Sequence, residues 1–322
     1  MPLTRRLLHA ALLATLAPLS LGAAQAQERP PLKIVVGFPP GGSADTLARL
    51  IGEQLRDQYS SVVVENRPGA GGRIALQQVK RAAPDGQTVI VLPSGPMVLF
   101  PHVYKKLDYD AVSDFTPISL IANFQFGVVA GPASPAANVA EMVKGAKAQP
   151  GAASYGTPGL GTLPHFMGVL FEQRVGAQLN HVPFQGGGPA NTALLGGHIH
   201  YKFDVVSETA ELHRAKKVRI LAVTGATRDP QVPEVPTLKE SGIDMVATAW
   251  FAMYGPAQMN PAARDRLSQA VATAVKSPAL RERLLGLGYE PVGSTSAELA
   301  AAQAADLKRW EAPIKATGIQ LD

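Results

Sequence analysis

Hydrophobic residues follow two alternating patterns along this chain. The runs at 32–36, 61–65 and 88–92 are rich in valine and isoleucine, which predicts short buried strands. Stretches starting at Ser43 and after Gly72 follow the first two runs, and their apolar residues recur at helical steps. Strands that alternate with helices predict parallel βαβ units and an α/β fold.

The helix expected from Ser43 has one apolar face. Leu47, Leu50, Ile51 and Leu55 recur at three- and four-residue steps, so they should pack on the sheet. Ser43 itself is expected to be the N-cap of this helix.

The same two patterns continue to the end of the chain. We expect strands at 117–121 continuing into 126–130, at 152–155, at 198–204 and at 218–224. Helices are expected at 138–148, around Phe166 to Phe171, at 191–195 with Pro189 at a first helical position, from Pro261 onward, and at 297–316. Residues 229–236 should form a proline-rich loop.

The first 26 residues resemble an export signal. Arg5 and Arg6 precede an apolar stretch at 7–21, and the segment closes on a small-residue pattern ending at Ala26. We expect a signal peptide at 1–26 that is cleaved near Ala26, which directs the protein to the periplasm. The alternatives are an uncleaved membrane helix and, because of the arginine pair, twin-arginine export.

Composition excludes several classes of function. The 322 residues carry 30 Lys and Arg against 25 Asp and Glu, a modest excess without a basic cluster, so we expect no nucleic acid partner. The absence of cysteine rules out disulfides, thiol catalysis and cysteine-ligated metals. No cofactor is expected.

A glycine-rich loop at 37–45 lies between the first strand and the first helix. Glycines let the backbone approach a ligand, and the N–H groups at a helix start favour a carboxylate or phosphate. The loop lacks both the dinucleotide pattern G-x-G-x-x-G and the Walker lysine. It predicts an anion site, and the alternative is a tight turn without a ligand.

Two later loops extend this prediction. The loop at 154–165 also joins a strand to a helix, and the Thr157 and Thr162 hydroxyls could donate to a carboxylate. His165 fits a packed, capping histidine better than a ligand contact. The loop at 182–190 could be a third wall or a simple turn, and Asp204 could hold a loop or touch a ligand's distal group.

Neither metal nor catalytic chemistry has positive support. His198 and His200 share a strand face, but no third ligand completes a metal site. We found no usable G-x-S-x-G, H-E-x-x-H or S-x-x-K motif, so we expect no catalytic residue and no enzyme. A periplasmic hydrolase or transferase acting on a small carboxylate, and an interaction protein without a ligand, remain the alternatives.

Several separated motifs resemble one known family. They are VVGFPPGGSAD at 35–45, ENRPGAGG at 65–72, PDGQT at 84–88, YGTPGLGTLPHF at 155–166, HVPFQGGGPA at 181–190, FD at 203–204 and the VPTLKESG stretch at 235–242. Together and in this order they resemble the Bug extracytoplasmic solute receptors, the substrate-binding components of tripartite tricarboxylate transporters.

The resemblance implies a fold and its division. It implies a type II periplasmic binding protein fold, in which two α/β lobes enclose a central ligand cleft. Residues 30–127 and 253–322 would form lobe 1, and residues 128–252 would form lobe 2. The function it implies is capture of a small carboxylate, whether mono-, di- or tricarboxylate or aromatic. The partner would be membrane permease subunits or a sensor protein, and we expect a monomer.

The resemblance also implies where the ligand lies. In the family the first and second glycine loops grip a ligand carboxylate, partly through water, and other side chains form the cleft wall. The ligand-binding residues expected on this basis are Phe38, Pro39, Gly41, Gly42, Ser43, Ser94, Phe126, Thr157, Gly159, Gly161, Thr162, Gly187 and Asp204.

Overall fold

The computed structural model describes residues 29–322, and the predicted signal peptide lies outside them. The strands are β1 (Leu32–Val36), β2 (Val62–Asn66), β3 (Thr88–Pro93), β4 (Phe115–Ala130), β5 (Ser154–Thr157), β6 (Asn180–Pro183), β7 (Tyr201–Val205), β8 (Arg219–Val223), β9 (Thr248–Pro256) and β10 (Glu290–Pro291). The helices are α1 (Ser43–Gln54), α2 (Arg73–Lys80), α3 (Gly95–Val98), α4 (Phe100–Val103), α5 (Val139–Ala148), α6 (Leu163–Val175), α7 (Gly187–Leu195), α8 (Ala210–Arg214), α9 (Pro261–Lys276), α10 (Pro278–Gly286) and α11 (Ser296–Thr317), with short 3₁₀ helices η1 (Ala70–Gly72) and η2 (Val206–Glu208).

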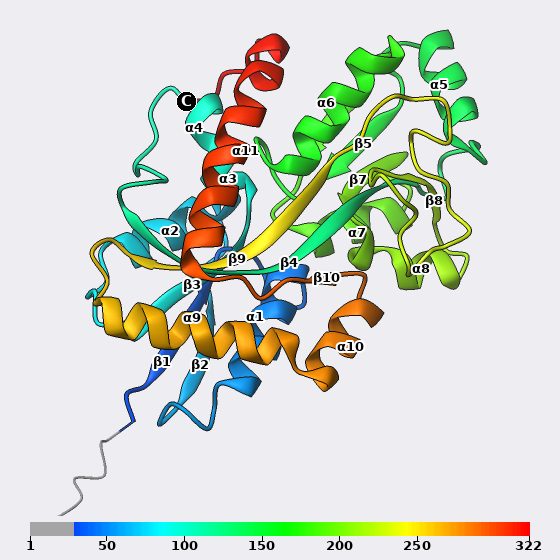
Figure 1. Cartoon of the computed structure of the whole chain (residues 1–322). Helices are drawn as coiled ribbons and strands as arrows, with labels where there is room; N and C mark the ends of the chain where they lie inside the picture. The colour runs from blue at the N-terminus through cyan, green and yellow to red at the C-terminus, as the bar shows by residue number, and fades with distance from the viewer. Residues whose placement is uncertain (1–28) are drawn as a thin grey trace, which may run out of the picture.

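The strands form one curled sheet that has two halves. Their order is β2-β1-β3-β9-β4-β7-β5-β6, and β8 and β10 also pair with β4. Residues 115–125 of β4 pair with β9, whereas 126–130 pair with β7 and β8. β4 therefore runs from the first half of the sheet into the second, and Figure 1 shows it crossing the middle of the molecule beside β9.

The outer strands of each half are parallel, as the sequence predicts. β1 pairs in parallel with β2 and β3, and β5 pairs in parallel with β6 and β7. The two central strands differ, because β9 runs antiparallel to β3 and β4, and β4 runs antiparallel to β7 and β8. The prediction of an α/β fold is confirmed, but the parallel units do not extend across the centre.

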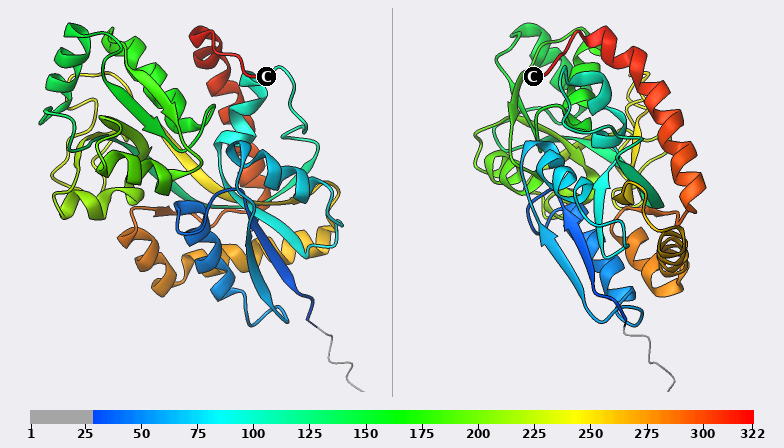
Figure 2. Two further views of the ribbon diagram at one scale, coloured as in Figure 1. Left: turned by 180° about the vertical axis from the view of Figure 1, so that it is seen from behind. Right: turned by 90° about the vertical axis from the view of Figure 1, so that its left-hand side faces the viewer.

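The C-terminal helices return to the first half. α9 and α11 pack against β4, and α11 also contacts α3 and α4. Figure 2 shows these orange and red helices together on one side of the molecule. Within residues 29–322, the helices fall short of the length and apolar character that crossing a bilayer requires.

Local predictions agree with the structure where the apolar pattern is strong. The predicted face of α1 is buried at Leu47, Leu50, Ile51 and Leu55. The strand expected at 198–204 begins only at Tyr201, because the preceding residues form a turn.

Two helix starts were predicted wrongly. Gly42 is the N-cap of α1, with extended backbone, so Ser43 is the first helical residue. α7 begins at Gly187, so Pro189 is its third helical residue and not its first.

Candidate functional site

A cavity of about 450 Å³ opens between the two halves of the sheet. Loops that precede three helices form most of its wall. The lining includes residues from 38–46, 93–96, 158–164, 187–191 and 204–211, together with Phe124, Phe126, Phe251 and Tyr289. A volume of this size is typical of small-molecule sites.

The turn before α1 is held in place by its own residues. Gly41 has a φ of +85°, which favours glycine, and its N–H donates to Asp45 Oδ2 at 2.9 Å. Arg49 and Asn66 also donate to this carboxylate, at 2.8–2.9 Å. Burial works against ionisation, but these hydrogen bonds outweigh it and lower the pKa of Asp45. Contacts within the protein therefore hold this loop in place.

The ENRPGAGG motif at 65–72 packs against the same loop. A Cβ added to Gly37 would lie 2.6 Å from the Cα of Gly72, so the two backbones meet too closely for a larger residue. This motif therefore acts as packing for the β1–α1 turn, although Gly71 also reaches the cavity wall.

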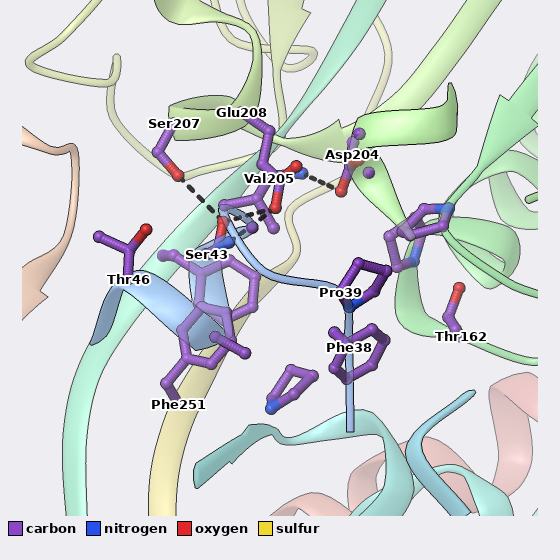
Figure 3. A pocket seen from close by; sticks show the side chains of 18 of the residues that line it. Phe38, Pro39, Ser43, Thr46, Thr162, Asp204, Val205, Ser207, Glu208 and Phe251 are labelled. Carbon is purple, nitrogen blue, oxygen red and sulfur yellow. Dashed lines mark hydrogen bonds between the residues drawn. The ribbon is translucent and has the colours of Figure 1, made fainter. Parts of the chain in front are cut away.

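A carboxylate from the other half of the molecule lies at the start of α1. Oε1 of Glu208, in η2, accepts from the Ser43 N–H and from the Ser43 hydroxyl, at 2.9 Å each. Ser207 Oγ lies 3.4 Å from Ser43 Oγ and 2.8 Å from the hydroxyl of Tyr289. Figure 3 shows Ser207 and Glu208 facing Ser43. These contacts join the two halves across the cavity, and the helix start already holds an anion.

A buried ion pair lies beside Glu208. Lys202 Nζ is 2.7 Å from Asp204 Oδ2, and both side chains are almost wholly buried. Nζ also donates to Asn191 Oδ1 at 2.7 Å and to the Gly187 carbonyl at 3.2 Å. Burial raises the pKa of Asp204 to about 6, against the opposing effect of Lys202, and the Glu208 charge adds to the rise.

The second glycine loop contributes less than the sequence predicts. Both threonine hydroxyls donate inward to the Gly159 carbonyl, Thr157 at 3.2 Å and Thr162 at 2.7 Å. Thr157 Oγ1 also lies 2.7 Å from His181 Nε2 and is fully buried. In this structure the loop uses both hydroxyls to hold itself, so the expectation that they donate to a carboxylate gains no support and stays a prediction. Thr162 still lines the cavity through its position at the N-cap of α6.

The structure brings nine of the thirteen predicted site residues to the cavity. They are Phe38, Pro39, Gly41, Gly42, Ser43, Phe126, Thr162, Gly187 and Asp204. The other four are not among the lining residues: Ser94, Thr157, Gly159 and Gly161. Ser94 is buried, its N–H donates to the Trp250 carbonyl of β9, and its own carbonyl accepts from Met97 and Val98 at the start of α3.

The buried histidine His165 bears on the predictions about metal binding and helix capping. Among residues 29–322 no group of three or more potential ligands is close enough to hold a metal ion. His165 is buried, stacks on His181 and accepts from the Gly161 N–H, which agrees with a packed, capping role.

Sequence reasoning missed Glu208, Ser207, Tyr289 and Phe251. Glu208 and Ser43 are 165 positions apart, and no motif or period links them. Tyr289 follows α10 in a stretch with no binding pattern.

Comparison with known proteins identifies relatives over nearly the whole chain. The model of the tripartite tricarboxylate transporter family receptor matches residues 47–319. Protein BugT of Bordetella pertussis is 31% identical over 294 residues, which cover 90% of each protein.

Solved structures of similar proteins agree with these matches. The Rhodopseudomonas palustris protein Rpa4515, solved with adipate, has a TM-score of 0.87 and 31% identity, covering 90% of this chain and 98% of that one. MatC from the same organism, solved with bound malate, has a TM-score of 0.83 and 29% identity, covering 88% and 98%.

Proposed function

Because this chain belongs to the tripartite tricarboxylate transporter receptor family, we propose that its cavity binds a small carboxylate for transport or sensing. The family consists of solute-binding receptors, and its members are periplasmic. The bound adipate and malate of the two Rhodopseudomonas proteins support a carboxylate ligand.

The observation that carries the proposal is the convergence of helix starts on one cavity. The first residues of α1, α6 and α7 all belong to its lining. The positive end of each helix favours an anion, and the N–H groups that Glu208 does not occupy provide donors without a basic side chain. The first two of these starts are the glycine loops that the sequence singles out.

Capture by closure is the proposed mechanism. The two lobes would be residues 30–127 with 253–322, and residues 128–252. Within residues 29–322, β9 pairs from Thr248 with β3 and with the 115–125 part of β4, which both lie in the first half, and this favours a second boundary near 248. A solute that contacts both lobes favours the closed arrangement, because it binds that arrangement more tightly than the open one.

The remaining parts of the proposal concern processing and partners. We propose that the signal peptide is cleaved near Ala26, and that the receptor works as a monomer. Its partners would be the membrane permease subunits of a tripartite transporter, or a sensor protein.

Isothermal titration calorimetry of the purified protein tests the proposed function. The panel contains adipate, malate, monocarboxylates, aromatic acids and amino acids, with their neutral amides as controls. We expect at least one acid to bind, whereas its amide does not. The proposal would be contradicted if an acid and its amide bound equally tightly, or if none of the acids in the panel bound.

A further inference from the structure

We propose that the preferred solute is a zwitterion, a carboxylate that also carries a protonated amino group, and that Glu208 and Asp204 bind this amino group. The inference rests on the proposed receptor function and narrows its ligand class.

The charge of the cavity wall is the first argument. Within the described chain, the charged side chains that line the cavity are Asp204, Glu208 and Glu211, and no lysine, arginine or histidine lines it. Lys202 is fully buried behind Asp204 and already donates to two other oxygens. A dicarboxylate would bring a second negative charge to this acidic wall, and like charges repel strongly where water is excluded.

Two acceptor oxygens of this wall can accept a further hydrogen bond. Glu208 binds Ser43 through Oε1, while Oε2 accepts no hydrogen bond among residues 29–322. Asp204 Oδ2 is buried and ion-paired with Lys202 Nζ at 2.7 Å, and within the same residues it has no second donor. A carboxylate oxygen has two lone-pair sites, so each of these oxygens can still accept from a ligand.

Both oxygens lie against the same glycine. A Cβ added to Gly187 would overlap Glu208 Oε2 and would lie 2.9 Å from Asp204 Oδ2. The two carboxylates therefore converge on one place, as Figure 3 shows for their side chains. An ammonium group has three donors and one positive charge, so a single group can bind both oxygens.

The carboxylate end of the solute has a separate place. At α1 the Ser43 N–H already binds Glu208. At α6 the Leu163 N–H donates to no backbone acceptor or capping side chain within residues 29–322, and Thr162 and Leu163 both line the cavity. The positive end of this 13-residue helix suits the carboxylate.

Apolar side chains line the space between these ends. Phe38, Phe126 and Phe251 belong to the cavity wall, and Figure 3 shows Phe38 and Phe251 on the side away from Glu208. The cavity therefore has an acidic region, an apolar region and a helix start, which fit the amino group, the apolar middle and the carboxylate of one solute.

Matched acids test the inference. Calorimetry at pH 7.5 compares succinate with 4-aminobutanoate, adipate with 6-aminohexanoate, and suberate with 8-aminooctanoate, each pair having the same number of carbons. Bound solute is first removed by dialysis. We expect the tightest-binding amino acid to bind about tenfold more tightly than its dicarboxylate, since a charge-assisted hydrogen bond replaces a repulsion.

The variant Glu208→Gln separates charge from shape. Its amide oxygen can still accept from Ser43, so the fold should hold, and an unchanged melting temperature checks this. We expect amino acid binding to weaken by about tenfold and dicarboxylate binding to tighten. Glu311→Gln is the matched control, because Glu311 lies outside the cavity lining, is 49% exposed and pairs with Lys315. It should change either affinity by less than about twofold.

The outcomes distinguish this inference from the proposed function. Suppose that a dicarboxylate binds as tightly as the amino acid of the same length, and that Glu208→Gln does not change their relative affinities. This result overturns the proposal of a zwitterionic solute and leaves the proposed receptor function standing. If the panel of the preceding subsection also contains no acid that binds, the receptor function itself is wrong.

Discussion

Replacing Lys202 by methionine should strongly destabilise the protein. Methionine has a similar length and fills the apolar part of the site, but it cannot pair with Asp204. The Lys202 side chain is 0% exposed and that of Asp204 is 2% exposed, so solvent does not screen the pair. Removing one partner of a buried ion pair leaves an uncompensated charge, which costs about 3–5 kcal/mol.

The size of this loss should depend on pH. Lys202 lowers the pKa of Asp204 against the effect of burial, so its removal raises that pKa further above the unfolded value. A carboxyl group with a raised folded pKa stabilises the fold below the unfolded pKa of 3.8, and this contribution is lost as the pH rises through the folded pKa. The difference between Lys202→Met and the wild type should therefore shrink as the pH falls from 7 to 4.

Urea unfolding followed by fluorescence of Trp250 and Trp310 measures both effects. The double variant Lys202→Met/Asp204→Leu is the control, because it removes both charges and should recover part of the loss. A loss below about 1 kcal/mol in Lys202→Met, or a double variant as unstable as the sum of its single variants, would refute this account of the pair.

Three further predictions concern the loop, the buried histidines and a helix cap. Gly42→Asp should keep the fold, since φ is −80° there, but it places a second carboxylate near Glu208 Oε1. Calorimetry should therefore find dicarboxylate binding lost in this variant and retained in Gly42→Asn, because like charges repel. Burial lowers the pKa of His165 to about 4, so the stability that neutral His165 provides is lost as the pH falls from 6.5 to 4. In thermal unfolding, His165→Asn should reduce this dependence of stability on pH. An unchanged dependence would contradict the assigned role of His165. Asn260 accepts from two N–H groups of α9, so Asn260→Ala should cost about 1 kcal/mol in urea unfolding, and no loss would contradict a capping role.

The sequence predicts the parts of the site that depend on local backbone. The loop at 38–43 reaches the cavity because it follows a buried strand and begins a helix whose apolar face is plain in the pattern. The strand β9, in contrast, was not predicted, because its pattern gives no local signal. Eight of its nine residues are buried, on both faces, so the alternation that marks a half-exposed strand is absent.

Side-chain direction and long-range contacts were beyond such reasoning. The Thr157 hydroxyl turns inward because the Gly159 carbonyl and His181 compete for it, and spacing gives no sign of this. Glu208 meets Ser43 only because β4 and β7 bring η2 across the sheet. A lone glutamate after a strand carries no local signal of that contact.

The 16-residue strand β4 has a mechanical consequence. Since it supplies hydrogen bonds to β9 at one end and to β7 and β8 at the other, neither half of the sheet keeps its edge satisfied without it. Heat or denaturant that melts β4 removes the central ladder from both halves at once. The molecule should therefore unfold in one cooperative step. Any motion between the halves has to bend or twist β4, because this strand is continuous through both of them.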